Sequence, residues 1–349
     1  MTRSKPVDAI AVVLALTLGS AALSSPEVNG FSSPSVLRVV IDQQDSNVLY
    51  AATYLYTQAP EHGVFKSTDQ GQSWFTVNDG LPDLNVSTMA MDPQNSDTLY
   101  VGVNDGIFKS INGGGLWSPT APPGVYNIHD IAVDPLDSNT IFAGGDGAFS
   151  YTKSTDGAIT WSPSPGIGHV FSFAIDPRNS ETIYAGVFRG KAGGAVYKSI
   201  DGGDHWFSAN RGLPEAWVSA VVIDHQNSKI LYAGTAEYGL YKSTDGAAQW
   251  NLSLEGIHLS AHCLAMDPRD SNTVYAGTSE DAPGYPKRIF KTTDGGDTWY
   301  EADSGITTQT WTYSLAIDRQ DSTIIYAGTN HGIFKSIDAG DSWFPTGLQ

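Results

Sequence analysis

The chain has 349 residues, of which 40% are hydrophobic, 16% are charged and 37 are glycine, and its formal net charge is −18. This composition is typical of a folded, turn-rich β protein and excludes a disordered chain. The acidic balance excludes nucleic acid as a partner and argues against binding to an anionic membrane surface.

The first 24 residues carry the pattern of a secretory signal peptide. Arg3 and Lys5 precede an apolar stretch over residues 9–18, and small residues follow it. This order of basic, apolar and small residues is typical of an export signal. We therefore expect residues 1–24 to be removed, residues 25–35 to form a linker, and the mature protein to be secreted or periplasmic without a membrane span. A retained N-terminal anchor is the alternative, although the apolar stretch is short for a bilayer.

The rest of the sequence repeats one unit seven times, and each unit holds a box of the form Ser/Thr-x-Asp-x-Gly-x-x-Trp. The box tryptophans are Trp74, Trp117, Trp161, Trp206, Trp250, Trp299 and Trp343, with spacings of 43, 44, 45, 44, 49 and 44 residues. Three β-type runs precede each box, as in "LRVVID", "NVLYAAT" and "GVFKS", and a fourth begins at the tryptophan. Four short runs per unit predict an all-β fold, a seven-bladed β-propeller with four-stranded antiparallel blades over residues 36–349.

The chemistry of the box is that of a turn. Its Asp can accept hydrogen bonds from turn N–H groups, and its Gly can adopt a positive φ without steric cost. The departures are Asn112 in place of Asp in the second box, and Ala158 and Ala247 in place of the later Gly in the third and fifth. Because every unit has its own copy, we interpret the box aspartates as structural rather than catalytic or metal-binding. The tryptophan is expected to bury its ring in the blade.

With seven boxes in register, the sequence resembles the BNR, or Asp-box, propellers over nearly all of residues 36–349. That superfamily includes sialidases, the xyloglucan-active hydrolases of glycoside hydrolase family seventy-four, sortilin and the photosystem II assembly-factor propellers. The repeat style is most similar to the assembly-factor and xyloglucanase types. The resemblance implies the fold, but it spans both enzymes and binding proteins.

Several activities of that superfamily do not match these residues. The Arg-Ile-Pro motif that usually accompanies a sialidase site is missing, and the family seventy-four enzymes need two propellers whereas this chain has one. The basic docking patch of the assembly factors is also at odds with the acidic charge. For a glycosidase, which needs two nearby carboxylates, Asp130 is the best single candidate. Its potential loop partners are Glu61, Glu237, Glu280 and Asp281. The alternative is that all of these are solvated surface acids.

The upper face of the propeller is expected to consist of the connections between strands two and three and between successive blades. These loops vary in length, and loops on a rigid scaffold usually carry function. Aromatic and imidazole groups gather at the upper edges of blades 5, 6 and 7, where they suit sugar rings or partner side chains. The predicted ligand-binding residues are Trp217, Tyr238, His262, Tyr285, Trp311 and Tyr313, with His258 nearby. The alternative is that Trp217 and Trp311 pack between blades.

No cofactor and no metal are expected, because the histidines show no ligand spacing. Cys263, the one cysteine, is expected to be a buried, inert thiol. We therefore predict an exported, monomeric binding or interaction module, and not an enzyme, whose upper face binds a glycan or a protein partner. The alternative is a carbohydrate-active glycoside hydrolase of the xyloglucanase or sialidase type.

Overall fold

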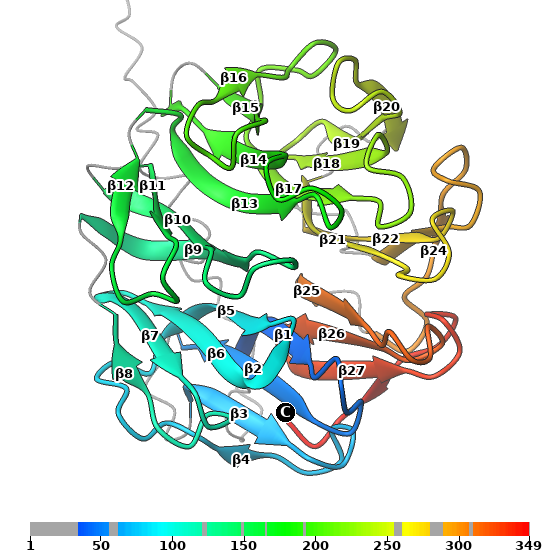
Figure 1. Ribbon diagram of the computed structural model, residues 1–349. Helices are drawn as coiled ribbons and strands as arrows, with labels where there is room; N and C mark the ends of the chain where they lie inside the picture. Colours follow the sequence, from blue (N-terminus) through cyan, green and yellow to red (C-terminus); the bar gives the residue numbers. More distant parts are fainter. Residues whose placement is uncertain are drawn as a thin grey trace, which may run out of the picture.

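The computed structural model describes residues 34–55, 62–120, 124–147, 150–164, 166–190, 193–254, 260–279, 289–306 and 310–348. These residues form seven four-stranded antiparallel sheets, and no α-helix occurs among them. Figure 1 shows the sheets as blades around a common centre, with the first strand of each blade innermost. The predicted seven-bladed propeller is confirmed.

The first four blades are made of consecutive strands. Blade 1 comprises β1 (Ser35–Ile41), β2 (Leu49–Tyr54), β3 (Val64–Ser67) and β4 (Phe75–Thr76). Blade 2 comprises β5 (Val86–Asp92), β6 (Asn95–Val103), β7 (Gly106–Ser110) and β8 (Ser118–Pro119). Blade 3 comprises β9 (Val125–Val133), β10 (Ile141–Gly147), β11 (Tyr151–Ser154) and β12 (Ser162–Ser164). Blade 4 comprises β13 (His169–Ile175), β14 (Ile183–Phe188), β15 (Gly194–Ser199) and β16 (Phe207–Ser208).

The last three blades follow the same plan. Blade 5 comprises β17 (Val218–Ile223), β18 (Leu231–Thr235), β19 (Gly239–Ser243) and β20 (Asn251–Leu254). Blade 6 comprises β21 (Ser260–Met266), β22 (Val274–Ser279), β23 (Ile289–Thr292) and β24 (Tyr300–Glu301). Blade 7 comprises β25 (Thr312–Ile317), β26 (Ile325–Thr329), β27 (Gly332–Ser336) and β28 (Phe344–Pro345).

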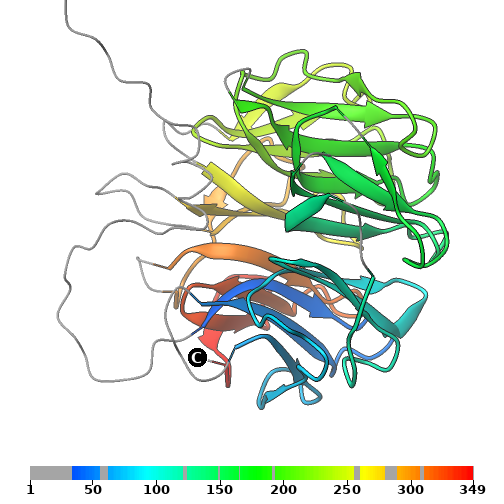
Figure 2. The ribbon, with the colours of Figure 1, turned by 90° about the vertical axis from the view of Figure 1, so that its left-hand side faces the viewer.

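Among the residues that the structure describes, the ring closes without an exchanged strand. Blade 7 takes all four described strands from the C-terminal repeat, and β1 packs against β25 and β26. The C-terminal segment adds backbone bonds on both sides of this seam: Leu348 O accepts from Ile333 N, and Gly347 N donates to Gly71 O, each at 3.1 Å. Figures 1 and 2 both place the C-terminus beside the seam between the red and blue blades. The prediction that the last blade is complete in its own repeat is confirmed.

A second set of contacts, the serine–aspartate ring, joins every blade to the next at the end of its first strand. Each Asp-x-x-x-Ser turn uses its Asp to accept from the backbone two residues on, as Asp176 does from Arg178 N at 2.9 Å. The same carboxylate accepts a hydroxyl from the next blade, as between Ser228 Oγ and Asp176 Oδ1 at 2.6 Å. The ring consists of the pairs Ser96–Asp42, Ser138–Asp92, Ser180–Asp134, Ser228–Asp176, Ser271–Asp224, Ser322–Asp267 and Ser46–Asp318.

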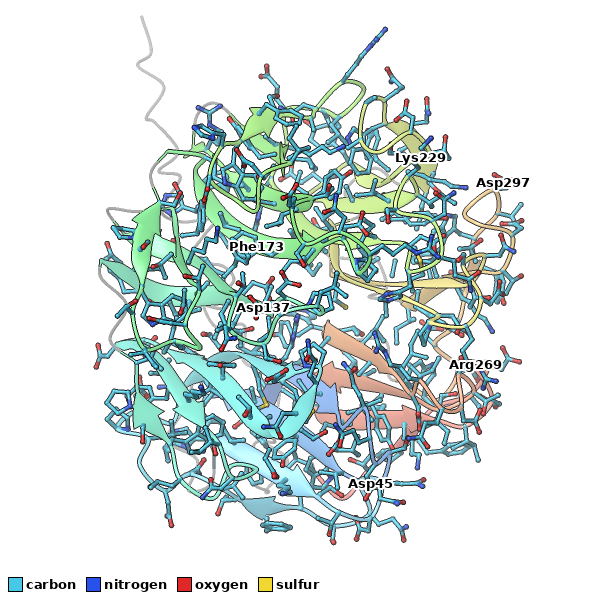
Figure 3. All side chains as sticks on the ribbon, viewed as in Figure 1. Asp45, Asp137, Phe173, Lys229, Arg269 and Asp297 are labelled. Atoms are coloured by element: carbon cyan, nitrogen blue, oxygen red, sulfur yellow. The ribbon has the colours of Figure 1, made fainter. Side chains whose placement is uncertain are left out.

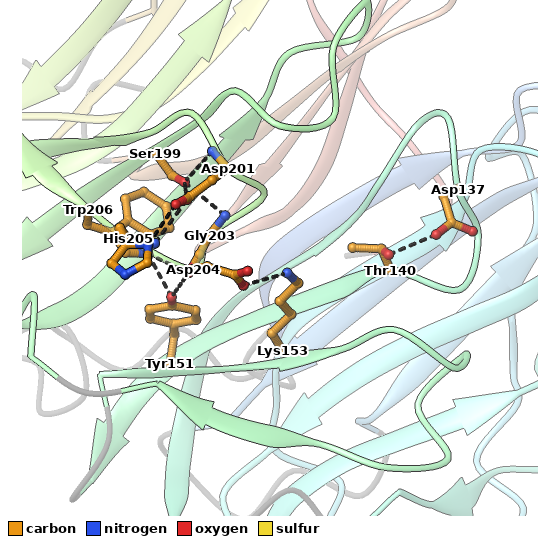
Figure 4. A network of polar contacts seen from close by, with 10 residues as sticks. All are labelled: Asp137, Thr140, Tyr151, Lys153, Ser199, Asp201, Gly203, Asp204, His205 and Trp206. Carbon is orange, nitrogen blue, oxygen red and sulfur yellow. Dashed lines mark hydrogen bonds and ion pairs between the residues drawn. The ribbon is translucent and has the colours of Figure 1, made fainter.

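The Asp boxes are turns, as predicted. In the fourth box, shown in Figure 4, Asp201 accepts from Ser199 Oγ at 2.8 Å and from His205 N at 2.9 Å. The preceding blade also holds this turn, because Tyr151 OH donates to Gly203 O at 2.6 Å. The boxes therefore order their own hairpins and also attach one blade to another.

Two successive positions in each box adopt a positive φ, and glycine does not always occupy them. Ala158 and Ala247, which replace the later glycine, both have φ of 68°, and Gln70 and Ala339 stand at the earlier position with φ of 60° and 58°. An L-residue in this conformation costs about 1–2 kcal/mol. The hydrogen bonds of the turn therefore impose the left-handed geometry even where glycine is absent.

Close packing between neighbouring blades explains the "YAG" pattern of the second strands. The Tyr and Ala of this pattern are buried in the strands that carry them, as Tyr184 and Ala185 are in β14. A Cβ added to Gly186 would lie 2.9 Å from Val218 O of blade 5. Glycine is required here because the next innermost strand approaches the backbone too closely for a side chain.

The box tryptophans do not all bury their rings to the same extent. Trp117, Trp250 and Trp343 are at most 2% exposed, and their Nε1–H groups donate to carbonyls of the preceding blade. Trp74, Trp161, Trp206 and Trp299 are half-buried. The predicted burial is therefore complete in three blades and partial in four.

Candidate functional site

The innermost strands share an irregularity at their upper ends. In six blades the pairing of strands one and two skips one residue, as between Val170 and Ser172 of β13, and blade 3 has a larger shift opposite Asp146. A β-bulge re-aims the side chain of the extra residue. Each residue at this position is half-buried, whereas the residue before it in the sequence is buried. The residues at this position are Leu37, Ser87, His129, Phe171, Ser219, His262 and Tyr313.

Aromatic groups at this level form a continuous row, the aromatic arc, across blades 3 to 6. The rings of His129 and Phe171 stack with centroids 4.1 Å apart and an interplanar angle of 16°. Phe171 contacts Trp217 at 4.6 Å, and Trp217 meets His262 edge-on at 6.1 Å. Phe188 adds a further contact with Trp217 at 6.3 Å. The arc places flat apolar faces of four neighbouring blades side by side.

A carboxylate beside the arc binds two imidazoles. His129 Nε2 and His169 Nδ1 lie 3.1 and 2.8 Å from Asp146 Oδ1, and Asn127 Nδ2 lies 3.3 Å from Oδ2. Partial burial raises the pKa of the Asp146 carboxyl, but the hydrogen bonds from both imidazoles outweigh burial and hold the pKa well below its ordinary value. The contact with Asp146 in turn raises the pKa of His169. The Asp146 carboxyl is therefore ionised at neutral pH.

Asp130, the weak catalytic candidate, lies below this cluster and is not a solvated surface acid. It is 5% exposed; its Oδ2 accepts from Phe173 N at 2.8 Å, and its Oδ1 lies 3.5 Å from Arg38 Nη2. Burial raises its pKa, although Arg38 and the backbone N–H groups oppose this shift. Ser172 and Ser314 use their hydroxyls in the same way, each accepting from a backbone N–H of the next blade. Asp130 therefore serves as a link between innermost strands.

The predicted ligand-binding residues differ in how exposed their side chains are. Trp217 is 8% exposed, with an Nε1–H that is buried and has no acceptor among the described residues. His262 is half-buried in the arc, whereas Tyr238 is 50% exposed on the loop between β18 and β19. Trp311 and Tyr313 are half-buried and contact each other edge-on at 6.1 Å. Tyr285 and His258, together with the acids Glu61, Glu280 and Asp281, lie outside the described residues.

The structure brings together residues that sequence reasoning did not single out. Phe171, Phe188 and Asp146 all lie at the upper ends of strands in blades 3 and 4. The two phenylalanines contact Trp217, and Asp146 contacts His129 of the aromatic arc. The candidate site therefore includes blades 3 and 4 in addition to the predicted sector of blades 5 to 7. Phe171 could not be found from the sequence because side chains alternate between the two faces of a strand, which would place Phe171 on the same face as the buried Phe173. The β-bulge between Val170 and Ser172 breaks this alternation.

Two cavities lie on the axis of the ring, toward the turns of the serine–aspartate ring. They measure about 340 and about 310 Å³ and are lined by innermost strands. Neither cavity includes Trp217 or Trp311. The cavities are thus separate from the aromatic arc.

The described ranges contain neither a metal-binding cluster nor a membrane-spanning helix. No group of three or more His, Cys, Asp or Glu side chains in that part of the chain is arranged to hold a metal ion. Within the same residues, no helix is long and apolar enough to cross a membrane.

Comparisons with known proteins agree with this architecture. No protein-family model matches the chain. A xyloglucanase from Hypocrea jecorina (strain QM6a) is 32% identical over 101 residues, which is 26% of this chain and 12% of that protein. The GH74 xyloglucanase from Xanthomonas campestris superposes with a TM-score of 0.74 at 19% identity, covering 90% of this chain and 54% of the enzyme. YCF48 bound to a D1 peptide superposes with a TM-score of 0.63 at 14% identity, covering 87% of this chain and 93% of YCF48.

The chain is a seven-bladed β-propeller. Both types of propeller that the repeats resemble are thus found among its structural neighbours. At these identities the likeness establishes the fold alone. The chain spans about half the length of the solved xyloglucanase and a small part of the curated one.

Proposed function

We propose that the protein is an exported binding module that holds a glycan on the upper face of the propeller. The aromatic arc carries this proposal. The half-buried rings of His129, Phe171 and His262 leave ring surface against which sugar rings can pack, and the Asp146 carboxylate beside His129 can accept sugar hydroxyls. The face extends through His262 to Trp311 and Tyr313, which we propose as anchors at its far end.

The buried indole of Trp217 supports a ligand at this level. Buried N–H groups usually have an acceptor, and the Nε1–H of Trp217 has none among the described residues. A ligand hydroxyl at the rim of the arc is a suitable acceptor after a small movement of the ring. Tyr238, half exposed on the adjacent loop, offers a further contact at the edge of the face.

A protein partner is the competing occupant of the same face. YCF48, which has the same fold, was solved with a D1 peptide. The net charge of −18 disfavours acidic partners, whereas a neutral glycan carries no such electrostatic penalty. We therefore propose a glycan as the ligand of the upper face, and binding of a peptide is the alternative result of the test.

A glycoside hydrolase is the second candidate function. It is favoured by the xyloglucanase match and by two carboxyls in blade 3, Asp130 and Asp146, whose pKa values shift in opposite directions. Against it, Asp130 is buried and both of its oxygens face other groups, so it cannot reach a glycosidic oxygen without rearrangement.

The test is a screen of the mature protein against arrayed neutral plant and bacterial glycans and arrayed peptides, followed by calorimetry on the best binder. The proposal predicts a glycan binder that is recovered intact by mass spectrometry after prolonged incubation. Cleaved products would establish the hydrolase instead. Binders found only among the peptides would contradict the glycan assignment.

A further inference from the structure

The two cavities on the axis form one channel with charged groups at its end. They share the lining residues Leu264, Leu315, Ile317 and Arg319, so they adjoin. Most other lining residues are apolar and come from innermost strands; they include Val39, Met89, Met91, Phe173, Val221 and Met266. Figure 3 places Phe173 beside the centre of the ring of blades. A combined space of this size is within the range of small-molecule sites.

Arg319 lines both cavities and has no acidic partner. Its Nη1 donates to Gln43 Oε1 at 2.8 Å, and among the described residues no carboxylate forms an ion pair with it. The neighbouring Asp318 is occupied, since its Oδ1 accepts from Gln320 N and from Ser46 Oγ. A guanidinium presents a planar set of donors that matches a carboxylate, and most of this set is unused here.

The other charged groups of the channel already have polar partners. Arg38, at the far end of the first cavity, faces Asp130 at 3.5 Å. Asp42 accepts hydrogen bonds from Gln44 N at 2.8 Å and from the serine of the next blade. These hydrogen bonds do not cancel the charges of Asp42 and Asp318, so Arg319 is distinguished by its unused donors and not by a net positive charge of the channel.

His225 lines the second cavity together with Arg319 and adds a donor. Its partial burial, with the nearby charge of Arg319, lowers the pKa of its imidazole, which is therefore neutral and can donate one N–H. One cation beside a neutral donor suits a monoanion better than a doubly charged phosphate. The apolar walls suit a hydrocarbon body attached to that anion.

We propose that the axial channel binds a small organic monocarboxylate, whose carboxylate pairs with Arg319 and whose apolar body lies against Leu264, Leu315 and Ile317. This site is independent of the aromatic arc and of the glycan proposal.

The probe is 4-phenylbutyrate, and its amide is the neutral control of the same shape. Calorimetry and methyl NMR of the mature protein should show saturable binding of the acid, with shifts at Leu264, Leu315 and Ile317, and at least tenfold weaker binding of the amide. Arg319→Gln should remove the binding, and Arg319→Lys should restore part of it.

Arg269→Gln is the matched control, because Arg269 donates to Gln320 O on the same face but lines neither cavity. Figure 3 places it toward the edge of the ring. It should bind the acid as the wild type does, and so should Phe171→Ala. Absence of binding by the wild type at millimolar acid, equal binding of acid and amide, or unchanged binding by Arg319→Gln would each overturn the proposal.

Discussion

Ser46 and Asp318 are 272 residues apart in the sequence, yet Ser46 Oγ donates to Asp318 Oδ1 at 2.8 Å and so joins the first blade to the last. It is the closing member of the serine–aspartate ring. Among the described residues no strand is exchanged at this seam, so backbone, side-chain and packing contacts between blades 1 and 7 hold it closed.

Ser46→Ala should lower the free energy of unfolding by about 1–3 kcal/mol, the range for a hydrogen bond to a charged acceptor. Ser180→Ala removes the equivalent bond between blades 3 and 4 and is the matched control. Both variants should lose similar stability in urea, but hydrogen exchange in β1 and β25 should accelerate only in Ser46→Ala. Equal exchange in the two variants would mean that the seam is no weaker than the other interfaces.

Trp250→Ala should cost about 3–5 kcal/mol, because the ring is 1% exposed and its Nε1–H is bonded to Ala209 O. Trp206→Ala should cost roughly half as much, since that ring is only half-buried. Urea denaturation of both variants measures the difference. Equal losses would contradict the distinction between fully and partly buried box tryptophans.

Asp146 and His169 should titrate as a coupled pair. The raised pKa of His169 stabilises the fold below the ordinary histidine pKa of about 6.5, and this contribution disappears as pH rises through the folded-state pKa. The depressed pKa of Asp146 contributes above about pH 4 and is lost as pH falls. Stability from the pair should therefore be greatest between about pH 5 and 6.5.

NMR titration of the imidazoles checks this directly. Asp146→Asn should lower the His169 midpoint, whereas Asp137→Asn, in a turn between the first two strands of the same blade, should leave it unchanged. A His169 midpoint that does not respond to Asp146→Asn would contradict the pairing.

Cys263 should be unreactive in the folded protein. Burial raises the pKa of its thiol to about 12, and the sulfur faces Thr312 O at 3.6 Å. A thiol reagent such as DTNB at pH 8 should react at the rate of unfolding, and with one thiol per chain in urea. Reaction of the native protein at the rate of a free thiol would show that the site is open.

The fold could be predicted because its signals are local and occur seven times. A turn box and three apolar runs recur in every unit, and each repetition reinforces the same period. The contacts that assemble the blades could not be predicted in this way. The serine of each Asp-x-x-x-Ser turn bonds to the preceding blade, and the sequence pattern alone is explained equally well by a turn within one blade.

The candidate site was only partly predictable for the same reason. Trp217 and His262 belong to the aromatic arc, as expected of the upper ends of their strands. Phe171 was missed because a bulge turns it away from the face of Phe173, and bulges leave no mark in an apolar run. Asp146 was missed because its importance comes from His169 of the next blade.

The most direct test of the proposed function compares two phenylalanines of blade 4. Phe171 lies in the aromatic arc, whereas Phe207 is 46% exposed on the outermost strand. With the glycan found by the array, calorimetry of Phe171→Ala should show at least a tenfold loss of affinity, about 1.4 kcal/mol, and Phe207→Ala should bind as the wild type does. Unchanged affinity in folded Phe171→Ala, or an equal loss in Phe207→Ala, would contradict a glycan site on the arc.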